Sequence, residues 1–334
     1  MPETLPRRRV GQSGLEITVL GLGCAALGNL YERVEAEVAR ATLAEAATGG
    51  VRYFDTAPYY GHGLSETRLG EFLGDRTVTD AVVSSKVGRS LIPVKPGDEG
   101  AFGFVEPLNY RPEFNYSADA VRTQVEGSLE RLQIERFGML LLHDIGAMTH
   151  GDAHPLVFRQ AMDEALPELR SLKEQGLVDA IGIGVNEIEV SLATLRAADI
   201  DVILLAGRYT LLEQEALAEL LPECEARGVS VVVGGPYNSG ALAGGRHYDY
   251  DTMPPEVAER VERLAAICGR HRVPLQAAAL QFPLAHGAVA AVIPGARSVA
   301  EVQANLDYLS CYLPDALFAE LKAEGLLARD APVP

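Results

Sequence analysis

Eight short apolar runs alternate with helical segments along this chain of 334 residues. Each run is apolar throughout rather than at every second position, which is typical of parallel strands buried on both faces. The segments between them are helical in pattern; one has apolar residues at Val121, Val125, Leu129 and Leu132, the period of a helix face. The predicted strands are Val19–Gly23, Val51–Phe54, Ala81–Lys86, Met139–Leu142, Ala180–Gly184, Val202–Leu205, Ser230–Val233 and Val289–Ile293.

Repeated strand–helix units of this kind predict an α/β fold, a (β/α)8 TIM barrel. A doubly wound open sheet is the alternative for the same alternation. No Gly/Ser-rich or Pro-rich linker divides the chain, so we expect a single domain over residues 1–334. The predicted helices are Glu35–Ala47, Ala118–Leu132, Gln160–Gln175, Ile188–Ala197, Glu213–Ala226, Ala258–Arg270 and Val299–Leu309.

The segments outside this repeat also carry information. Residues 7–18 alternate in polarity around a turn, which predicts an N-terminal hairpin that closes the barrel floor. Three long connections, 87–117, 143–158 and 234–255, each follow a strand, so in a barrel they lie on the C-terminal face, where active sites lie. Since 87–117 is rich in aromatic residues, we expect it to form a packed lid or pocket wall.

Composition narrows the class of partner. The net charge of −17 argues against nucleic acid and anionic membranes, which attract cationic proteins, and leaves a small-molecule substrate as the expected partner. No apolar run approaches the about 18 residues that span a bilayer, and no apolar stretch follows the N-terminal arginines as in a signal peptide. The four cysteines are Cys24, Cys224, Cys268 and Cys311, and none belongs to a C-x-x-C pair. We therefore expect free thiols, no metal site and a cytoplasmic protein.

A glycine-rich segment, Gly21–Gly28, resembles a dinucleotide-binding fingerprint after a strand. In that motif the helix begins at the glycines, whereas here the first helical pattern begins only near Glu35. Asp55 ends the next strand and imitates the ribose-binding acid of the motif. We therefore interpret the segment as a barrel strand whose glycines let a ligand approach the backbone.

Polar residues stand at the C-terminal ends of four successive predicted strands: Asp55, Lys86, His143 and Asn186. A tyrosine, Tyr60, follows five positions after the first of them. Tyrosine normally titrates near about 10, so it transfers protons at neutral pH only beside a positive charge in a dry pocket. Lys86 at the end of the neighbouring strand would supply that charge.

At these positions the chain resembles the aldo-keto reductase superfamily over nearly its whole length. The resemblance implies a barrel with a nicotinamide cofactor and a catalytic tetrad of Asp55, Tyr60, Lys86 and His143. The motifs that carry it are Phe54-Asp55-Thr56-Ala57 with Tyr60-Gly61 and Ser65-Glu66, Ser84-Ser85-Lys86, Leu141-Leu142-His143, Gly184-Val185-Asn186, and Ile293-Pro294-Gly295-Ala296-Arg297-Ser298 with Asn305.

The resemblance also implies a role for each member. Tyr60 is the general acid/base, Lys86 lowers its pKa, and Asp55 holds the lysine in place. His143 donates a hydrogen bond to the substrate oxygen, and Asn186 holds the nicotinamide carboxamide.

The cofactor end departs from many relatives, which clamp the 2′-phosphate of NADPH with a lysine and an arginine. Here those positions read Gly295 and Glu301, while Arg297 keeps one cation nearby, so NAD is favoured and NADP stays an alternative. The aromatic that often stacks on the nicotinamide is replaced by Gly234, for which Tyr209 is the candidate substitute. The expected cofactor-binding residues are Gly23, Asn186, Tyr209, Pro236, Asn238, Ser239, Gly295, Ala296, Arg297, Glu301 and Asn305.

Three motifs resemble a bacterial subgroup of D-threo-aldose, L-fucose and pyridoxal dehydrogenases: Pro58-Tyr59-Tyr60-Gly61, Val185-Asn186-Glu187 and Gly235–Gly240. This implies oxidation of a cyclic hemiacetal, an aldose or pyridoxal, to a lactone with NAD+. An NADPH-dependent reductase of aldehydes or ketones is the alternative, and a cofactor-bound regulatory subunit is a third reading. The family default implies a monomer or a small homo-oligomer.

Overall fold

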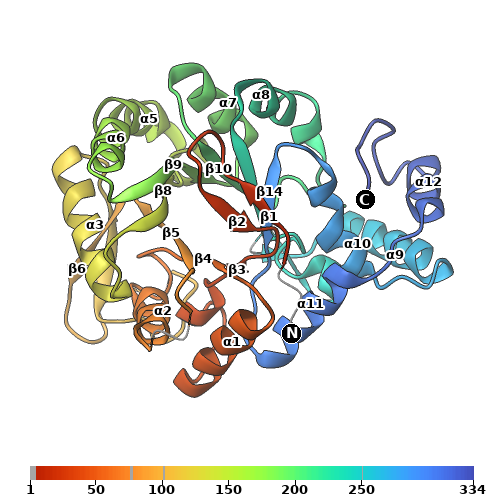
Figure 1. Ribbon diagram of the computed structural model, residues 1–334, viewed down its shortest axis with the longest axis horizontal. Helices are drawn as coiled ribbons and strands as arrows, with labels where there is room; N and C mark the ends of the chain where they lie inside the picture. The colour runs from red at the N-terminus through yellow and green to blue at the C-terminus, as the bar shows by residue number, and fades with distance from the viewer. Residues whose placement is uncertain (1–4, 76–77, 101, 250) are drawn as a thin grey trace.

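Eight parallel strands form one sheet in the computed structural model, which describes residues 5–75, 78–100, 102–249 and 251–334. Their order along the sheet is β14-β11-β10-β9-β8-β5-β4-β3, so neighbours in sequence are neighbours in space (Figure 1). All eight predicted strands are present, with ends shifted by a few residues. Their bounds are β3 (Leu22–Gly23), β4 (Tyr53–Asp55), β5 (Val82–Val87), β8 (Phe137–His143), β9 (Val178–Val185), β10 (Val202–Ala206), β11 (Ser230–Gly234) and β14 (Val289–Ile293).

The two ends of this sheet meet. The backbone N–H of Gly21 donates to Val292 O at 2.9 Å, and the N–H of Val292 donates to Val19 O at 2.9 Å. Parallel bridges join Leu20 to Val292 and Gly23 to Gly295. These bonds close the sheet into a barrel, so the prediction of a (β/α)8 fold is confirmed and the open-sheet alternative is wrong.

Helices surround the barrel, and all seven predicted helical segments are helical in whole or in part. The prediction missed α2, α10 and α12, and it placed α4 and most of α5 in a long connection. Among the described residues, no helix has both the length and the apolar character of a membrane span. The helices are α1 (Ala36–Thr48), α2 (Leu64–Gly74), α3 (Ala118–Leu132), α4 (Ala147–His150), α5 (His154–Gln160), α6 (Leu166–Glu174), α7 (Ile188–Ala197), α8 (Leu220–Arg227), α9 (Pro255–Arg270), α10 (Leu275–Gln281), α11 (Val299–Ser310) and α12 (Asp315–Ala323).

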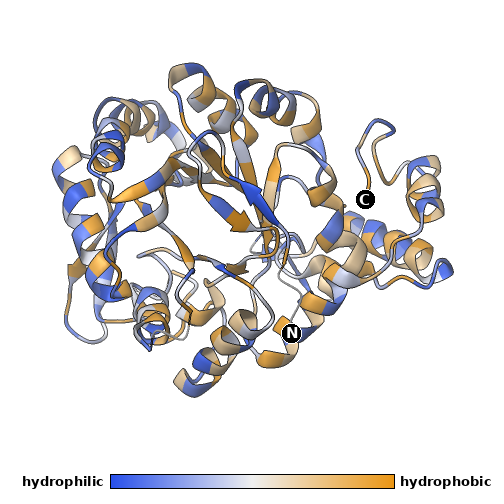
Figure 2. Ribbon diagram, in the orientation of Figure 1, coloured by the Kyte–Doolittle hydropathy of each residue, from blue (hydrophilic) through white to orange (hydrophobic). Residues whose placement is uncertain are grey.

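The predicted N-terminal hairpin is present as β1 (Arg7–Arg9) and β2 (Glu16–Thr18), paired antiparallel. It lies across the end of the barrel that faces the viewer in Figure 1. Its side chains Val10 and Ile17 are fully buried in a cluster with Met139 and other inward-facing strand residues. Figure 2 shows the barrel strands mainly in hydrophobic colours, whereas the surrounding helices carry both kinds of residue. The hairpin thus seals the floor, and the open end of the barrel is the opposite one.

The three long connections have structure of their own. Residues 87–117 contain the antiparallel pair β6 (Arg89–Pro93) and β7 (Tyr110–Phe114). Residues 143–158 contain α4 and most of α5, and 234–255 contain the small pair β12 (His247–Tyr248) and β13 (Asp251–Thr252). All three follow barrel strands, so they surround the open end.

The sealed floor leads to a stability prediction for Ile17→Ala. Because Ile17 is fully buried in the barrel interior, its truncation should lower the free energy of unfolding by about 2–5 kcal/mol. The matched control is Glu16→Ala, an exposed neighbour on the same strand, which should change it by less than about 0.5 kcal/mol. Urea unfolding followed by circular dichroism measures both, and equal losses would contradict the role of the hairpin as a plug.

Candidate active site

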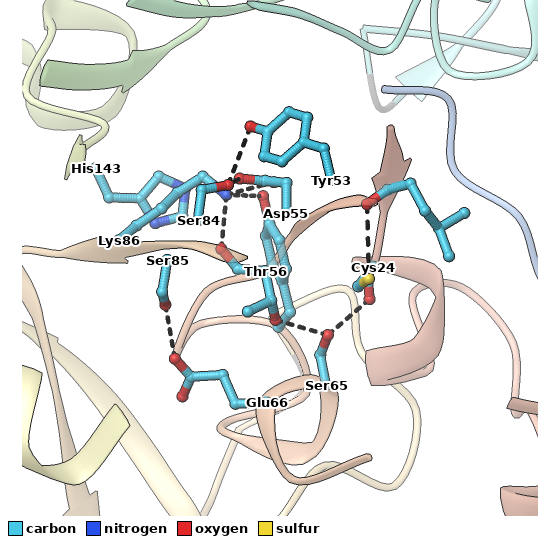
Figure 3. Close-up of polar contacts among 12 residues, drawn as sticks. Cys24, Tyr53, Asp55, Thr56, Ser65, Glu66, Ser84, Ser85, Lys86 and His143 are labelled. Atoms are coloured by element: carbon cyan, nitrogen blue, oxygen red, sulfur yellow. Dashed lines mark hydrogen bonds and ion pairs between the residues drawn. The ribbon is translucent and has the colours of Figure 1, made fainter. Parts of the chain in front are cut away.

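An ion pair between two neighbouring strands lies at the open end of the barrel. Lys86, near the end of β5, donates from Nζ to Asp55 Oδ2 at 2.8 Å and to Thr56 O at 2.9 Å (Figure 3). It also donates to the hydroxyl oxygen of Tyr60 at 2.9 Å. The ammonium also lies 4.5 Å from the centroid of the Tyr60 ring. Three of the predicted residues are therefore in direct contact.

Lys86 and Asp55 are both buried, so each charge needs a partner inside the protein. The side chains of Lys86 and Asp55 are 1% and 4% exposed, and an unpaired charge at such depth is strongly destabilising. The second carboxylate oxygen, Oδ1, accepts a hydrogen bond from Ser84 Oγ at 2.7 Å, and Ser84 Oγ is 3.0 Å from the hydroxyl of Tyr53. The ion pair is thus held by a polar network that reaches into the barrel interior.

The turn that carries Tyr60 is fixed by close backbone contact with the glycine-rich segment. A Cβ atom on Gly28 would lie 2.6 Å from the carbonyl carbon of Tyr60, so only glycine fits there. Gly61 has φ +65°, and its own Cβ would meet Gly28 O at 2.4 Å. The placement of the tyrosine therefore explains Gly28 of the glycine-rich segment and Gly61 of the turn. The helix α1 begins only at Ala36, unlike the helix of a dinucleotide fingerprint.

His143 lies on the other side of Tyr60, with the two ring centroids 6.0 Å apart. The strand end that carries it is braced by Tyr116, whose hydroxyl donates to His143 O at 2.6 Å. Burial, with the cations of Arg89 and Lys86 nearby, holds the pKa of His143 well below its usual range. At neutral pH the imidazole is therefore uncharged and has one N–H to donate.

A cleft of about 940 Å³ opens beside the ion pair, a size usual for a bound cofactor. Its lining runs from Asp55 and Tyr60 at the strand ends to the first turn of α11. The N-terminus of that 12-residue helix is capped by Ser298, and its free N–H groups suit an anion such as a phosphate. Seven of the predicted cofactor residues line the cleft: Gly23, Pro236, Ser239, Gly295, Arg297, Glu301 and Asn305.

Glycines along this lining leave room for a ligand. The nearest contact of a Cβ built on Gly295 is Gly23 O, at 3.7 Å, so the space beyond it belongs to the cleft. Gly234, where relatives often have an aromatic residue, also lines it. These features leave room for a dinucleotide between Tyr60 and the N-terminus of α11.

Four predicted cofactor residues are absent from the lining found among the described residues. Tyr209 is fully buried with its ring 5.2 Å from that of Phe282, so the expectation that it replaces a stacking aromatic in the cleft does not match its position. Asn238 instead braces a loop, since its amide donates to Gly207 O at 3.1 Å. Ala296 is fully buried, and Asn186, directly after β9, is partly buried.

Sequence reasoning missed other residues of the cleft. Tyr237 lies inside the motif Gly235–Gly240, and its hydroxyl donates to Asn305 Oδ1 at 2.6 Å. Burial raises the pKa of this hydroxyl, so it remains a hydrogen-bond donor. Tyr31 and His247 come from different loops and stack with centroids 5.4 Å apart. Glu32 binds Arg297 at 2.6 Å. Of these residues only Tyr237 lies in a motif that the sequence analysis singled out. The positions of Tyr31, His247 and Glu32 depend on how the loops fold.

Known proteins resemble this chain in sequence and in structure. The model of the aldo/keto reductase family matches residues 19–324. The chain is 39% identical to pyridoxal 4-dehydrogenase of Microbacterium luteolum, covering 96% of this chain and 98% of that protein. It is 39% identical to D-threo-aldose 1-dehydrogenase of a Pseudomonas species, covering 94% and 96%. A solved aldo-keto reductase of Bacillus halodurans in its holo form has a TM-score of 0.77 at 27% identity, covering 99% and 98%.

The buried ion pair predicts a large effect of Lys86→Met on stability. Since the change leaves the Asp55 carboxylate buried without its cation, the free energy of unfolding should fall by about 3–5 kcal/mol. Adding Asp55→Asn should recover part of that loss, because the unpaired charge is removed. The control is Arg111→Met in an exposed ion pair, with an expected loss of less than about 1 kcal/mol. Strictly additive losses for the two buried changes, measured by urea unfolding, would argue against a coupled pair.

Proposed function

Since this chain belongs to the aldo/keto reductase family and is an NAD(P)-dependent oxidoreductase, we propose that it oxidises a cyclic hemiacetal to a lactone with NAD+. The substrate class is an aldose such as L-fucose or D-arabinose, or pyridoxal. The observation that carries the proposal is the contact of 2.9 Å between Lys86 Nζ and the Tyr60 hydroxyl beside the cleft. The activities named for the two 39% identical relatives support the substrate class.

Tyr60 is the proposed base. Its phenolate oxygen accepts the proton of the anomeric hydroxyl, while the C1–H bond breaks and the carbonyl of the lactone forms. Lys86 stabilises the phenolate through its contact of 2.9 Å, and Asp55 keeps the ammonium in place. When bound, the nicotinamide ring supplies the hydride acceptor.

His143 and Asn186 are the proposed positioning groups for substrate and cofactor. The uncharged imidazole of His143 donates one hydrogen bond to the reacting oxygen and so orients the anomeric carbon. Asn186, at the end of β9, is proposed to hold the carboxamide. Tyr237 and Asn305, hydrogen-bonded at 2.6 Å, line the cleft and would contact the bound cofactor.

The preference for NAD rests on the surroundings of Arg297. Its guanidinium is 2.6 Å from Glu32 and 3.7 Å from Glu301, and its backbone N–H donates to Glu301 Oε2 at 2.8 Å. A 2′-phosphate in this region would meet two carboxylates and only one cation, which the carboxylates already neutralise. A free ribose hydroxyl, in contrast, can donate to either carboxylate.

An NADPH-dependent reduction of aldehydes or ketones is the alternative. It is favoured by Arg297 itself, whose side chain is 42% exposed at the N-terminus of α11 and can turn toward a phosphate. The same tyrosine would then act as an acid and give a proton to the carbonyl oxygen. The two functions differ in cofactor and in direction, not in the groups that react.

We also propose that the chain acts as one catalytic domain in the cytoplasm. One buried apolar cluster contains residues from Leu20 to Ala331, which supports a single domain. All four cysteines are free thiols, three of them buried, which supports a reducing compartment.

The experiment that tests the proposal is a substrate panel. Aldoses, pyridoxal and simple aldehydes are assayed in both directions with NAD(H) and NADP(H), and the absorbance of the reduced nicotinamide is followed. Oxidation of an aldose or of pyridoxal with NAD+ is the expected result. Activity only with NADP(H), together with no turnover of aldoses or pyridoxal, would overturn the proposal in favour of the reductase.

Tyr60→Phe should abolish turnover, with a loss of at least about a thousandfold in kcat, because only the proton-transferring hydroxyl is removed. Cofactor binding, followed by fluorescence titration with NADH, should change little. The control is Tyr312→Phe, which removes the same group from a residue that is 81% exposed and should keep full activity. If Tyr60→Phe retains most of its activity, another group is the base.

The double substitution Glu32→Gln with Glu301→Gln should shift the cofactor preference. Removing both carboxylates frees Arg297, so the ratio of kcat/KM for NADP+ to that for NAD+ should rise at least about tenfold. Glu37→Gln, which removes an exposed carboxylate from α1, is the control and should leave the ratio as it is. An unchanged ratio in the double variant would show that these carboxylates do not select the cofactor.

A further inference from the structure

A second, largely buried ion pair lies beside His143 and takes no part in the proposed proton transfer. Arg89, at the start of β6, donates from Nη2 to Asp144 Oδ2 at 2.6 Å. The same carboxylate oxygen is 3.6 Å from Nε2 of His143. The pair therefore lies next to the imidazole that is proposed to orient the substrate. Neither Arg89 nor Asp144 lines the cleft proposed for the cofactor; both lie beside His143, the residue proposed to orient the substrate.

One amino group of the Arg89 guanidinium, Nη1, has no hydrogen-bond partner among the described residues. The residue is 7% exposed, and its Nη1 is buried without a hydrogen-bond partner within the described residues. A buried donor that is left unpaired lowers stability by about 1–3 kcal/mol, so such a group calls for an explanation. The bond from Nη2 to Asp144 braces the strand end, but it does not explain Nη1.

Aromatic rings hold this guanidinium in place. Its Cζ lies 3.8 Å from the centroid of the Tyr59 ring and 4.7 Å from that of Phe114. The Tyr59 ring in turn lies 6.1 Å from that of His143, edge to face. The donor is thus fixed before any ligand arrives, which lowers the entropy lost on binding.

We propose that Arg89 and Asp144 form a hydroxyl-recognition site for the substrate: Nη1 of Arg89 donates to one hydroxyl oxygen, and the carboxylate of Asp144 accepts from a neighbouring hydroxyl. This inference rests on the proposed function and narrows its substrate class to a neutral, polyhydroxylated hemiacetal. A carboxylate has about four lone-pair sites, so Asp144 can accept from a substrate while it binds Arg89.

The charge of the site favours a neutral substrate over an anionic one. Arg89 and Asp144 neutralise each other, and the nearby His143 is uncharged at neutral pH. A phosphorylated or carboxylated substrate would place a charge beside Asp144 without a free cation to balance it. Vicinal hydroxyls offer one acceptor and one donor, which match the arginine and the aspartate.

The first test uses the unaltered enzyme and needs no variant. An oxidised aldose is compared with its deoxy analogues that lack one hydroxyl near the anomeric carbon, and with its phosphate ester. Loss of the recognised hydroxyl should lower kcat/KM at least about tenfold, because Nη1 or the carboxylate is left unpaired. Discrimination of less than twofold for every deoxy analogue, or a preference for the phosphate ester, would overturn the inference.

The second test assigns the discrimination to Arg89. The ratio of kcat/KM for the aldose to that for the deoxy analogue is measured in Arg89→Lys, which keeps a cation for Asp144 but has no second Nη group. We expect this ratio to fall at least about fivefold, mainly through KM for the aldose. The matched control is Arg111→Lys on β7 of the same hairpin, where the arginine is in an exposed pair with Glu113; its ratio should equal that of the unaltered enzyme.

The outcomes separate this inference from the proposed function. If Arg89→Lys lowers kcat/KM for both sugars by the same factor, the residue only braces the site, and the recognition role is overturned while the proposed function stands. If the unaltered enzyme oxidises pyridoxal but no aldose, the recognition role is overturned while the proposed function stands. If it binds NADH but oxidises neither an aldose nor pyridoxal, both are overturned. A variant that fails to fold, as judged by circular dichroism, leaves the deoxy and phosphate comparison to decide.

Discussion

A buried ammonium group is the constraint on which the rest of this site depends. Lys86 is almost fully excluded from water, so its charge is tolerated only because Asp55, Thr56 O and the Tyr60 hydroxyl all lie within 2.9 Å of Nζ. This requirement fixes β4 beside β5 and fixes the turn that follows β4. Placing Tyr60 against the lysine then requires the glycine contact with Gly28, which determines the course of the chain after β3.

The residues that stabilise the barrel and the residues proposed to react lie at opposite ends of it. The hairpin and the inward-facing apolar residues fill one end, and the polar residues stand at the other, where strand ends and long connections meet. Because the strands are parallel, residues that end successive strands lie side by side without any further device. The cleft proposed for the cofactor lies on one side of Tyr60, and His143 with the loops that follow β5 and β8 lies on the other.

The same logic explains what could be predicted from the sequence. The strands, the hairpin and the contact of Asp55, Tyr60 and Lys86 follow from local patterns and from the rule that parallel strand ends meet. Arg89 and the stacking of Tyr31 on His247 could not be predicted, since they depend on how separate loops approach one another. The surroundings of Tyr209 could not be predicted either: a position near the end of a strand does not tell whether a side chain faces the cleft or the core, and this residue is fully buried.

The charges at the site are paired locally, which the net charge of the whole chain does not reveal. The whole chain is strongly acidic, yet each described cation of the site is matched locally: Lys86 by Asp55, Arg89 by Asp144, and Arg297 by Glu32 and Glu301. Matched cations attract an added anion only weakly, so this arrangement does not favour a 2′-phosphate or a charged substrate. In the proposed reaction a negative charge forms on the Tyr60 oxygen, as the phenolate, and there Lys86 Nζ lies 2.9 Å away and stabilises it. The local pairing thus concentrates the electrostatic preference on the atom that takes the proton.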